Sequence, residues 1–219
     1  PLSQHPFRRF WRRFHLTKIL LIIGLGFSLL TGGYLFYLAK TTNVKDLQNA
    51  LKATTIIYDK NGDQAGSLTG QKGTYVELDA ISENLQNAVV ATEDRSFYKN
   101  SGINYGRFFL AILTLGRSGG GSTITQQLAK NAYLSQDQTV ERKAKEFFLA
   151  LEINKKYSKK EILTMYLNNA YFGNGVWGIE DASKKYFGVS ASQLSLDQSA
   201  VLAGMLKGPE IYNPLYSVE

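Results

Sequence analysis

The longest apolar stretch of the sequence lies near its N-terminus. Residues 19–39 contain no charged side chain, and Lys18 and Lys40 bracket them. As a helix this stretch would span about 31 Å, roughly the hydrocarbon thickness of a bilayer. The pattern predicts a transmembrane helix over residues 19–39, a basic cytoplasmic tail over residues 1–18 and a linker over residues 40–53.

Two other interpretations of this stretch stay open. A cleaved signal peptide has a shorter apolar region that ends in small residues, and a buried core helix can be equally apolar. An anchor with its N-terminus inside the cell is favoured, because arginines precede the stretch and two tyrosines near its C-terminal end lie at the place of an outer aromatic belt. These residues are Arg8, Arg9, Arg12, Arg13, Tyr34 and Tyr37. We therefore expect a single-pass membrane protein with its remaining domain outside the cell.

Beyond residue 54 the pattern changes twice. β-branched and aromatic residues over 55–58 precede Asn61-Gly62, a strong hairpin signal, so we expect a small β-hairpin near the membrane. From Asp79 onward apolar residues recur at helical spacing, and the fold class is mainly α. The expected helices cover residues 83–93, 104–116, 122–134, 139–157, 159–171, 178–187 and 196–206.

Polar residues at fixed spacing mark several helix ends. Ser158 with Glu161 and Ser195 with Gln198 are typical of capping boxes at helix starts. Gly188 indicates that a helix ends there.

Charge and composition exclude several classes of function. The net charge is +7, but five positive charges lie within the first 18 residues, and the remaining 20 Lys and Arg face 18 Asp and Glu. An excess of two is too small to indicate a nucleic-acid partner. Both histidines lie within the first 15 residues and there is no cysteine, which excludes Ser-His-Asp and Cys-His catalysis and the usual zinc sites. Carboxylates, Lys or Tyr must then carry any acid–base chemistry.

Three polar groupings are candidates for that chemistry. Glu93-Asp94 falls at a helix end, where acidic side chains oppose the helix dipole; the alternative is a solvated ion pair with Arg95. Glycines 119–121 precede a helix that starts at Ser122, so backbone N–H groups there favour an anion. The polar face of that helix presents Thr123, Gln127 and Lys130, and an ordinary solvated face is the alternative. Arg142 and Glu146, at i and i+4, would by themselves form only a surface ion pair.

Four motifs in order resemble those of the family 51 glycosyltransferases, the lysozyme-like domains of class A penicillin-binding proteins and monofunctional transglycosylases. They are EDRSF at 93–97, GGSTITQQ at 120–127, RKAKE at 142–146 and ILTMYLNNAYFG at 162–173. The resemblance covers roughly residues 54–214 and implies a lysozyme-like peptidoglycan glycosyltransferase domain over 54–219.

The resemblance also implies the reaction and the roles of residues. Such an enzyme polymerises lipid II into β-1,4-linked glycan with inversion and releases undecaprenyl diphosphate. Glu93 matches the catalytic base and Glu146 the second catalytic carboxylate. The matching positions for the diphosphate and the rest of the substrate are Asp94, Arg95, Ser122, Thr123, Gln126, Gln127, Lys130, Arg142 and Asn168.

The same resemblance implies binding partners. Expected partners are lipid II, the growing glycan strand, the membrane, cell-wall synthesis proteins and moenomycin-type inhibitors. No cofactor is required, although a divalent cation, Mg or Mn, is compatible with the diphosphate.

The sequence also departs from the family pattern. Asn100 stands where the family has His, and Gln138 replaces a basic residue. The family's final Arg-rich motif and a transpeptidase domain are absent from these 219 residues, so we expect a C-terminally truncated domain.

Other hypotheses remain at this point. A lysozyme-like hydrolase or lytic transglycosylase would share the fold and the catalytic glutamate, and a non-catalytic wall-binding or scaffold module would need neither carboxylate. The apolar residues 108–116 are either ordinary core or a surface that dips into the membrane to meet a polyprenyl substrate.

Overall fold

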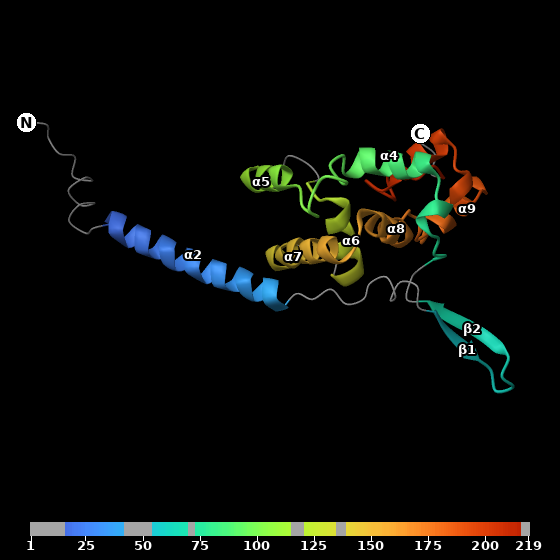
Figure 1. Ribbon diagram of the computed structural model, residues 1–219, viewed down its shortest axis with the longest axis horizontal. Helices are drawn as coiled ribbons and strands as arrows, with labels where there is room; N and C mark the ends of the chain where they lie inside the picture. Colours follow the sequence, from blue (N-terminus) through green and yellow to red (C-terminus); the bar gives the residue numbers. More distant parts are fainter. Residues whose placement is uncertain (1–15, 42–53, 70–72, 115–120, 135–138, 216–219) are drawn as a thin grey trace, which may run out of the picture. The chain divides into compact units, whose positions relative to one another are not determined.

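The chain forms two compact units, residues 1–42 and 43–219. In this computed structural model, residues 16–41, 54–69, 73–114, 121–134 and 139–215 are described (Figure 1). Residues 1–15 of the expected basic tail, residues 42–53 of the expected linker, the glycines at 119–120 and Gln138 lie outside these ranges.

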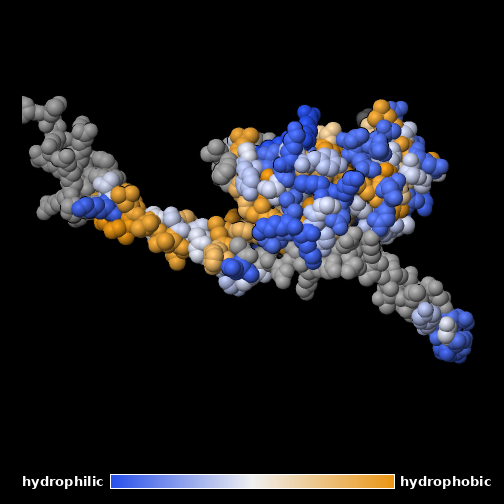
Figure 2. Space-filling view, in the orientation of Figure 1, coloured by the Kyte–Doolittle hydropathy of each residue, from blue (hydrophilic) through white to orange (hydrophobic). Residues whose placement is uncertain are grey.

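The first unit contains one long apolar helix, α2 (Leu16–Thr41). Its segment from Leu16 to Leu38 has a mean hydropathy of 2.1, long and apolar enough to cross a bilayer. Most of its large apolar side chains are exposed, and they colour most of the helix as hydrophobic in Figure 2. The predicted span of residues 19–39 therefore lies within a helix that extends slightly beyond it at both ends.

The second unit begins with an antiparallel strand pair at the predicted hairpin. Strands β1 (Thr54–Tyr58) and β2 (Gln64–Thr69) pair with a register shift between Ile57 and Tyr58. The turn between them contains Gly62 at φ +88°. The Asp59 carboxylate accepts backbone N–H groups of Asn61 and Asp63 at 2.8 and 2.9 Å, so the turn is closed by a side chain as well as by glycine.

The rest of this unit is helical, as predicted. Its elements in chain order are η1 (Leu78–Ala80), α4 (Glu83–Glu93), α5 (Tyr105–Leu113), α6 (Ile124–Tyr133), α7 (Val140–Lys156), α8 (Lys159–Asn169), α9 (Ile179–Phe187), η2 (Ala191–Gln193) and α10 (Leu196–Met205). α4 packs on α10, while α6 contacts both α7 and α8. Every residue of α8 from 162 to 168 is buried, so α8 is the central helix of the core.

Local capping explains where these helices begin and end. The Ser158/Glu161 and Ser195/Gln198 capping boxes are both formed, and Gly188 ends α9 in the left-handed conformation. The expected start at Ser122 was wrong. Thr123 is the N-cap of α6, because its hydroxyl accepts the backbone N–H of Gln126 at 3.1 Å.

The expected helix over 159–171 was also too long. α8 ends at Asn169, and the chain then makes a tight loop closed by a bridge between Tyr171 and Trp177. Gly173 and Gly175 have φ of +79° and +73° in this loop, a conformation that an α-helix cannot contain.

Helix α5 covers residues 108–113 of the apolar stretch 108–116, and its described side chains differ in burial. The Phe108 ring lies 5.1 Å from that of Phe147 on α7, centroid to centroid, so part of α5 packs against the body. Leu110 is 50% exposed, so another part presents apolar surface. The side chains of residues 109 and 111–113 lie outside the description.

Candidate active site

One pocket of the second unit brings together residues from distant parts of the sequence. Its volume is about 430 Å³. The end of α4, the start and polar face of α6, the middle of α7 and the turn after α10 all contribute to its walls. The described lining residues are Glu93, Ser122, Gln126, Gln127, Lys130, Glu146, Leu206 and Lys207. Both predicted catalytic carboxylates therefore line the same pocket.

Glu93 is the last residue of α4 and has a fixed orientation. Its Oε2 accepts a hydrogen bond of 2.6 Å from Gln127 Nε2, and Gln127 Oε1 accepts one of 3.0 Å from the Tyr166 hydroxyl. Burial raises the pKa of Tyr166 well above its ordinary value, and the nearby Glu93 charge raises it further. The phenol therefore stays protonated and donates its hydrogen bond to Gln127 Oε1. Because the amide oxygen faces Tyr166, the amide N–H of Gln127 faces Glu93.

This relay gives a testable role to Tyr166, which the sequence analysis did not identify. We expect Tyr166→Phe to lower kcat of the reaction expected from the sequence about tenfold, because losing one hydrogen bond of about 1–1.5 kcal/mol lets Gln127 turn away from Glu93. Steady-state rates measure the change in kcat, and thermal unfolding measures any loss of stability.

Tyr186→Phe is the matched control for this relay. Its hydroxyl donates to the Phe172 carbonyl at 2.7 Å, and Tyr186 is not among the pocket-lining residues. This variant should lose stability but keep its rate. Equal kcat in both variants would show that Tyr166 does not orient the site.

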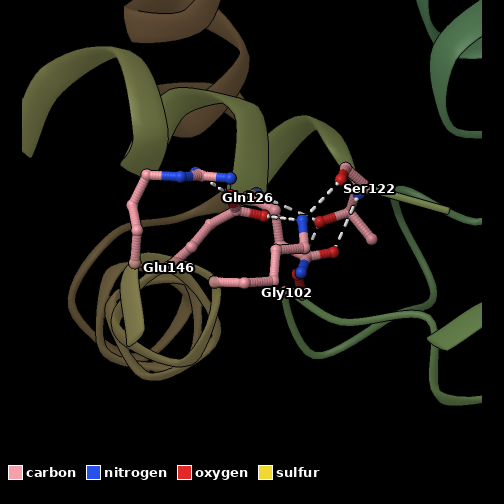
Figure 3. A network of polar contacts seen from close by, with 7 residues as sticks. Gly102, Ser122, Gln126 and Glu146 are labelled. Atoms are coloured by element: carbon pink, nitrogen blue, oxygen red, sulfur yellow. Dashed lines mark hydrogen bonds and ion pairs between the residues drawn. The ribbon is translucent and has the colours of Figure 1, made fainter. Parts of the chain in front are cut away.

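The second carboxylate, Glu146, is buried between two cations. Arg142 Nη1 lies 2.8 Å from Glu146 Oε2, and Lys143 contacts the other oxygen. Lys143 Nζ also donates to Ser122 Oγ at 2.9 Å (Figure 3). Glu146 is only 2% exposed, so the idea of an ordinary surface ion pair was wrong. Two cations around one carboxylate leave a local positive charge that favours an anionic ligand.

The start of α6 is held rigidly beside this cluster. Thr123 Oγ1 donates to the Gly102 carbonyl at 2.6 Å, and Gln126 Oε1 accepts the Thr123 N–H at 3.0 Å (Figure 3). Thr123 is 2% exposed and its hydroxyl is already used within the protein. Its position therefore argues for holding the helix start, whereas Ser122 and Gln126 line the pocket.

Asp94 also holds this region together. It is 2% exposed, and its oxygens accept hydrogen bonds from the Ser96 hydroxyl at 2.9 Å and Asn100 Nδ2 at 2.9 Å. The Ile124 N–H at the start of α6 lies 3.4 Å from Asp94 Oδ2. Asp94 thus joins the end of α4 to the start of α6, and its burial argues against the predicted substrate contact.

Asn100 completes this network. Its Oδ1 accepts the Gly102 N–H at 3.0 Å and the Lys159 ammonium at 3.0 Å. Burial lowers the pKa of Lys159, while the Asp94 charge opposes that shift. An amide can donate to Asp94 and accept from Lys159 at the same time, so Asn100 serves as a neutral bridge between the two.

Two further predicted substrate contacts lie away from the pocket. Asn168 is fully buried and bonds the backbone of Val76 and the Thr164 carbonyl. Arg95 is exposed, and its Nε donates to the Ala91 carbonyl at 3.1 Å. The structure therefore gives Asn168 a role in the core and places Arg95 on the surface beyond α4.

The structure adds residues that the sequence analysis missed. Lys143 stands inside the RKAKE motif, and that position was the signal that could have identified it. Tyr166 lies within the longest motif. Leu206 and Lys207 had no such signal, because only the packing of α10 on α4 brings their turn to the pocket.

A second pocket, of about 560 Å³, contains none of these residues. Its described lining is Gly73, Gly175, Val176, Trp177, Asp181 and Lys185. The first pocket is therefore the one that gathers the predicted chemistry.

Comparison with known proteins tests the family resemblance that the four motifs indicated. The transglycosylase family profile matches residues 61–219. This chain belongs to the transglycosylase family. The resemblance inferred from the four motifs is thus confirmed, and the second unit contains the transglycosylase domain.

Relatives of this transglycosylase are long proteins from several bacteria. It is 80% identical to penicillin-binding protein 2a of Streptococcus pneumoniae over 98% of its own length and 29% of the relative's. Penicillin-binding protein 1A of Aquifex aeolicus is 41% identical over 90% of this chain and 28% of that protein. Penicillin-binding protein 1A/1B of Bacillus subtilis is 39% identical over 91% and 22%. The chain thus spans less than a third of the length of each relative.

Proposed function

We propose that this transglycosylase polymerises lipid II into β-1,4-linked glycan, with Glu93 as the catalytic base. The observation that carries the proposal is the shared pocket, in which Glu93 and the cation-bound Glu146 face one space together with Lys130. A base on one wall and a positively charged cluster on another are the two elements that glycosyl transfer from a lipid diphosphate requires.

The proposed reaction is a direct displacement. Glu93 takes the proton of the acceptor's 4-hydroxyl, and the resulting oxygen attacks the anomeric carbon of the donor from the face opposite the diphosphate. The bond to the diphosphate breaks, so an α-linked donor becomes a β-linked product without a covalent enzyme intermediate. An inverting glycosidase uses the same arrangement with water in place of the sugar hydroxyl.

The leaving diphosphate gains negative charge in the transition state. Lys130 has its side chain on the pocket, and Lys143 and Arg142 already lie around Glu146. Cations held in place before the reaction stabilise such charge without reorganising. We assign Ser122 and Gln126, which line the same wall, to hydrogen bonding with the diphosphate oxygens. Glu146 positions Arg142 and Lys143.

The part of the chain that the structure describes does not form a metal site of its own. Among the described residues no group of three or more His, Cys, Asp or Glu could hold a metal ion. Both oxygens of Glu146 are occupied by Arg142 and Lys143. A Mg or Mn ion would therefore bind mainly through the diphosphate of the substrate, and no step of the proposal runs through one.

The anchor fits this substrate. We propose that α2 crosses the cell membrane with its N-terminus inside, so that the catalytic domain faces the outer surface where lipid II is presented. The half-exposed Leu110 on α5 adds apolar surface that suits a membrane interface. Interaction with other cell-wall synthesis proteins, and inhibition by moenomycin-type compounds, belong to the same proposal.

The proposal predicts growth of polymer from lipid II. Purified chain in detergent should convert lipid II into long glycan and leave finished glycan intact, as separated by gel electrophoresis. The cationic cluster around Glu146 favours this outcome over hydrolysis, because a hydrolase has no diphosphate to stabilise. Shortening of glycan without growth from lipid II would instead identify a lytic enzyme, and no change in either substrate would indicate a scaffold module.

A further inference from the structure

Lys159 is a cation in an unfavourable place. It is the first residue of α8, and the dipole of a helix disfavours positive charge at its N-terminus. Its ammonium lies 4.7 Å from the ring centroid of Phe97, a fully buried side chain. Burial lowers the pKa of Lys159, and the Asp94 charge opposes that shift. A lysine held where the helix dipole and partial burial both disfavour its charge indicates a role for the ammonium in this part of the fold.

The ammonium of Lys159 fixes the orientation of the Asn100 side chain. Asn100 Oδ1 accepts hydrogen bonds from this ammonium and from the Gly102 N–H, each at 3.0 Å. Because two donors hold the amide oxygen, the amide nitrogen faces Asp94, whose Oδ2 accepts its hydrogen bond at 2.9 Å. One amide thus connects the start of α8 to the residue that follows Glu93.

The contacts of Asn100 lead to two walls of the active-site pocket. Asp94 is the C-cap of α4, with φ −153° and ψ 82°, so the anchoring of its carboxylate constrains Glu93, the last residue of the helix. The Gly102 carbonyl accepts the Thr123 hydroxyl at 2.6 Å, and Thr123 caps α6, whose first turn lines the pocket. Asn100 therefore lies between the segment that carries the base and the wall assigned to the diphosphate.

Direct displacement needs these two walls at a fixed separation. The acceptor oxygen must lie close to the anomeric carbon of the donor while Glu93 contacts the acceptor hydroxyl, and a small misplacement of either substrate lowers the rate strongly. Lys159 is not among the described residues that line the pocket. Any effect of Lys159 on the reaction therefore passes through Asn100.

We propose that Lys159 is a positioning residue that, through Asn100, holds Glu93 and the start of α6 in the relative positions that glycosyl transfer requires. This inference rests on the proposed function. It assigns to the first residue of α8 an effect on the chemical step. The groups assigned to binding lipid II lie on α6 and α7 and are untouched by a change at Lys159, so substrate affinity should be preserved.

Lys159→Met removes the ammonium but keeps a long, unbranched side chain over Phe97. We expect kcat for lipid II polymerisation to fall about tenfold with KM within about twofold of the unaltered chain, because the base and the diphosphate wall lose their fixed separation. Lys159→Arg should recover most of the rate, since a guanidinium also donates to an amide oxygen. Rates are compared well below the lowest melting temperature of the set, so that each variant is folded.

Lys156→Met is the matched control. Lys156 is the last residue of α7, is exposed, and lies 5.4 Å from the ring centroid of Tyr157. It is outside the described pocket lining. Its replacement removes the same charge and the same kind of cation–π contact, so kcat should stay within about twofold of the unaltered chain. Equal kcat in Lys156→Met and Lys159→Met would overturn the role of Lys159.

The Asn100→Ala background separates positioning from a general loss of stability. Asn100→Ala alone should show the same fall in kcat at unchanged KM. In that background Lys159→Met should change kcat by less than about twofold, because the amide that transmits its effect is gone. A further loss of about tenfold would mean that Lys159 acts by another route, and the inference would be wrong. Native kcat in Asn100→Ala overturns it even where Lys159→Met does not fold.

Polymer formation by the unaltered chain tests the proposed function separately. If that chain polymerises lipid II while Lys159→Met matches its control, only the positioning role of Lys159 fails. If the unaltered chain forms no polymer, the proposed function and the positioning role both fail.

Discussion

Glu93→Gln is expected to lower the polymerisation rate by about 10²–10⁴-fold while leaving the domain folded. The amide keeps the size of the side chain but cannot take the proton of the acceptor hydroxyl. The 2.6 Å contact with Gln127 is between an acceptor and a donor in the native protein, and two amides can form it as well, so the packing around α4 should persist. Turnover of lipid II and thermal unfolding measure the two effects.

Glu83→Gln provides the control on the same helix. Glu83 is exposed in the first turn of α4, far along the helix from the pocket, so the variant should keep its rate and lose at most a few tenths of a kcal/mol of stability. Unchanged turnover in Glu93→Gln would remove the proposed mechanism. A large fall in its melting temperature would mean that Glu93 supports the fold instead.

Gly102→Ala is expected to destabilise the catalytic domain by about 3 kcal/mol, a fall in Tm of about 6–12 °C. Gly102 has φ +93°, which costs an L-residue about 1–2 kcal/mol. An added Cβ would also lie 2.6 Å from the Ala150 carbonyl oxygen of α7, and relieving that overlap costs about 1–3 kcal/mol. Because Gly102 accepts the Thr123 hydroxyl bond, activity should fall as the start of α6 shifts.

Gly188→Ala separates backbone strain from the clash. Gly188 has φ +69°, but nothing lies within 4 Å of an added Cβ, so this variant should lose only about 1 kcal/mol. Its position at the end of α9 is outside the pocket lining, and its activity should be normal. Equal destabilisation in both variants would show that contact with α7 does not constrain Gly102.

Much of the local structure could be predicted because its causes lie within a few residues. Hydrophobic spacing gave the helices, and the Ser158/Glu161 and Ser195/Gln198 pairs marked two starts correctly. The start of α6 was misplaced by the same reasoning, since Ser122 and Thr123 are both good caps. Thr123 is the cap because its hydroxyl can also reach Gly102, a contact that depends on another segment.

The candidate site also contains residues whose roles the sequence predicted and residues whose roles depend on tertiary contacts. The motifs pointed to Glu93, Gln127, Lys130 and Glu146, and all four line one pocket. They also pointed to Asp94 and Asn168, whose side chains are buried in bonds within the protein. A motif indicates that a residue type is required at a position. It does not distinguish a structural requirement from a chemical one.

By itself the sequence determined the apolar helix at the N-terminus, the mainly helical domain and the absence of histidine and cysteine from that domain, and it pointed to Glu93 as the candidate base. Only the tertiary structure decided which polar groups face the pocket. It buried Glu146 between Arg142 and Lys143 and connected Tyr166 to Glu93 through Gln127. It also brought Lys207 to the pocket that Glu93 lines. The physical reason is that helix formation depends on neighbouring residues, whereas burial and pairing depend on which helices pack together.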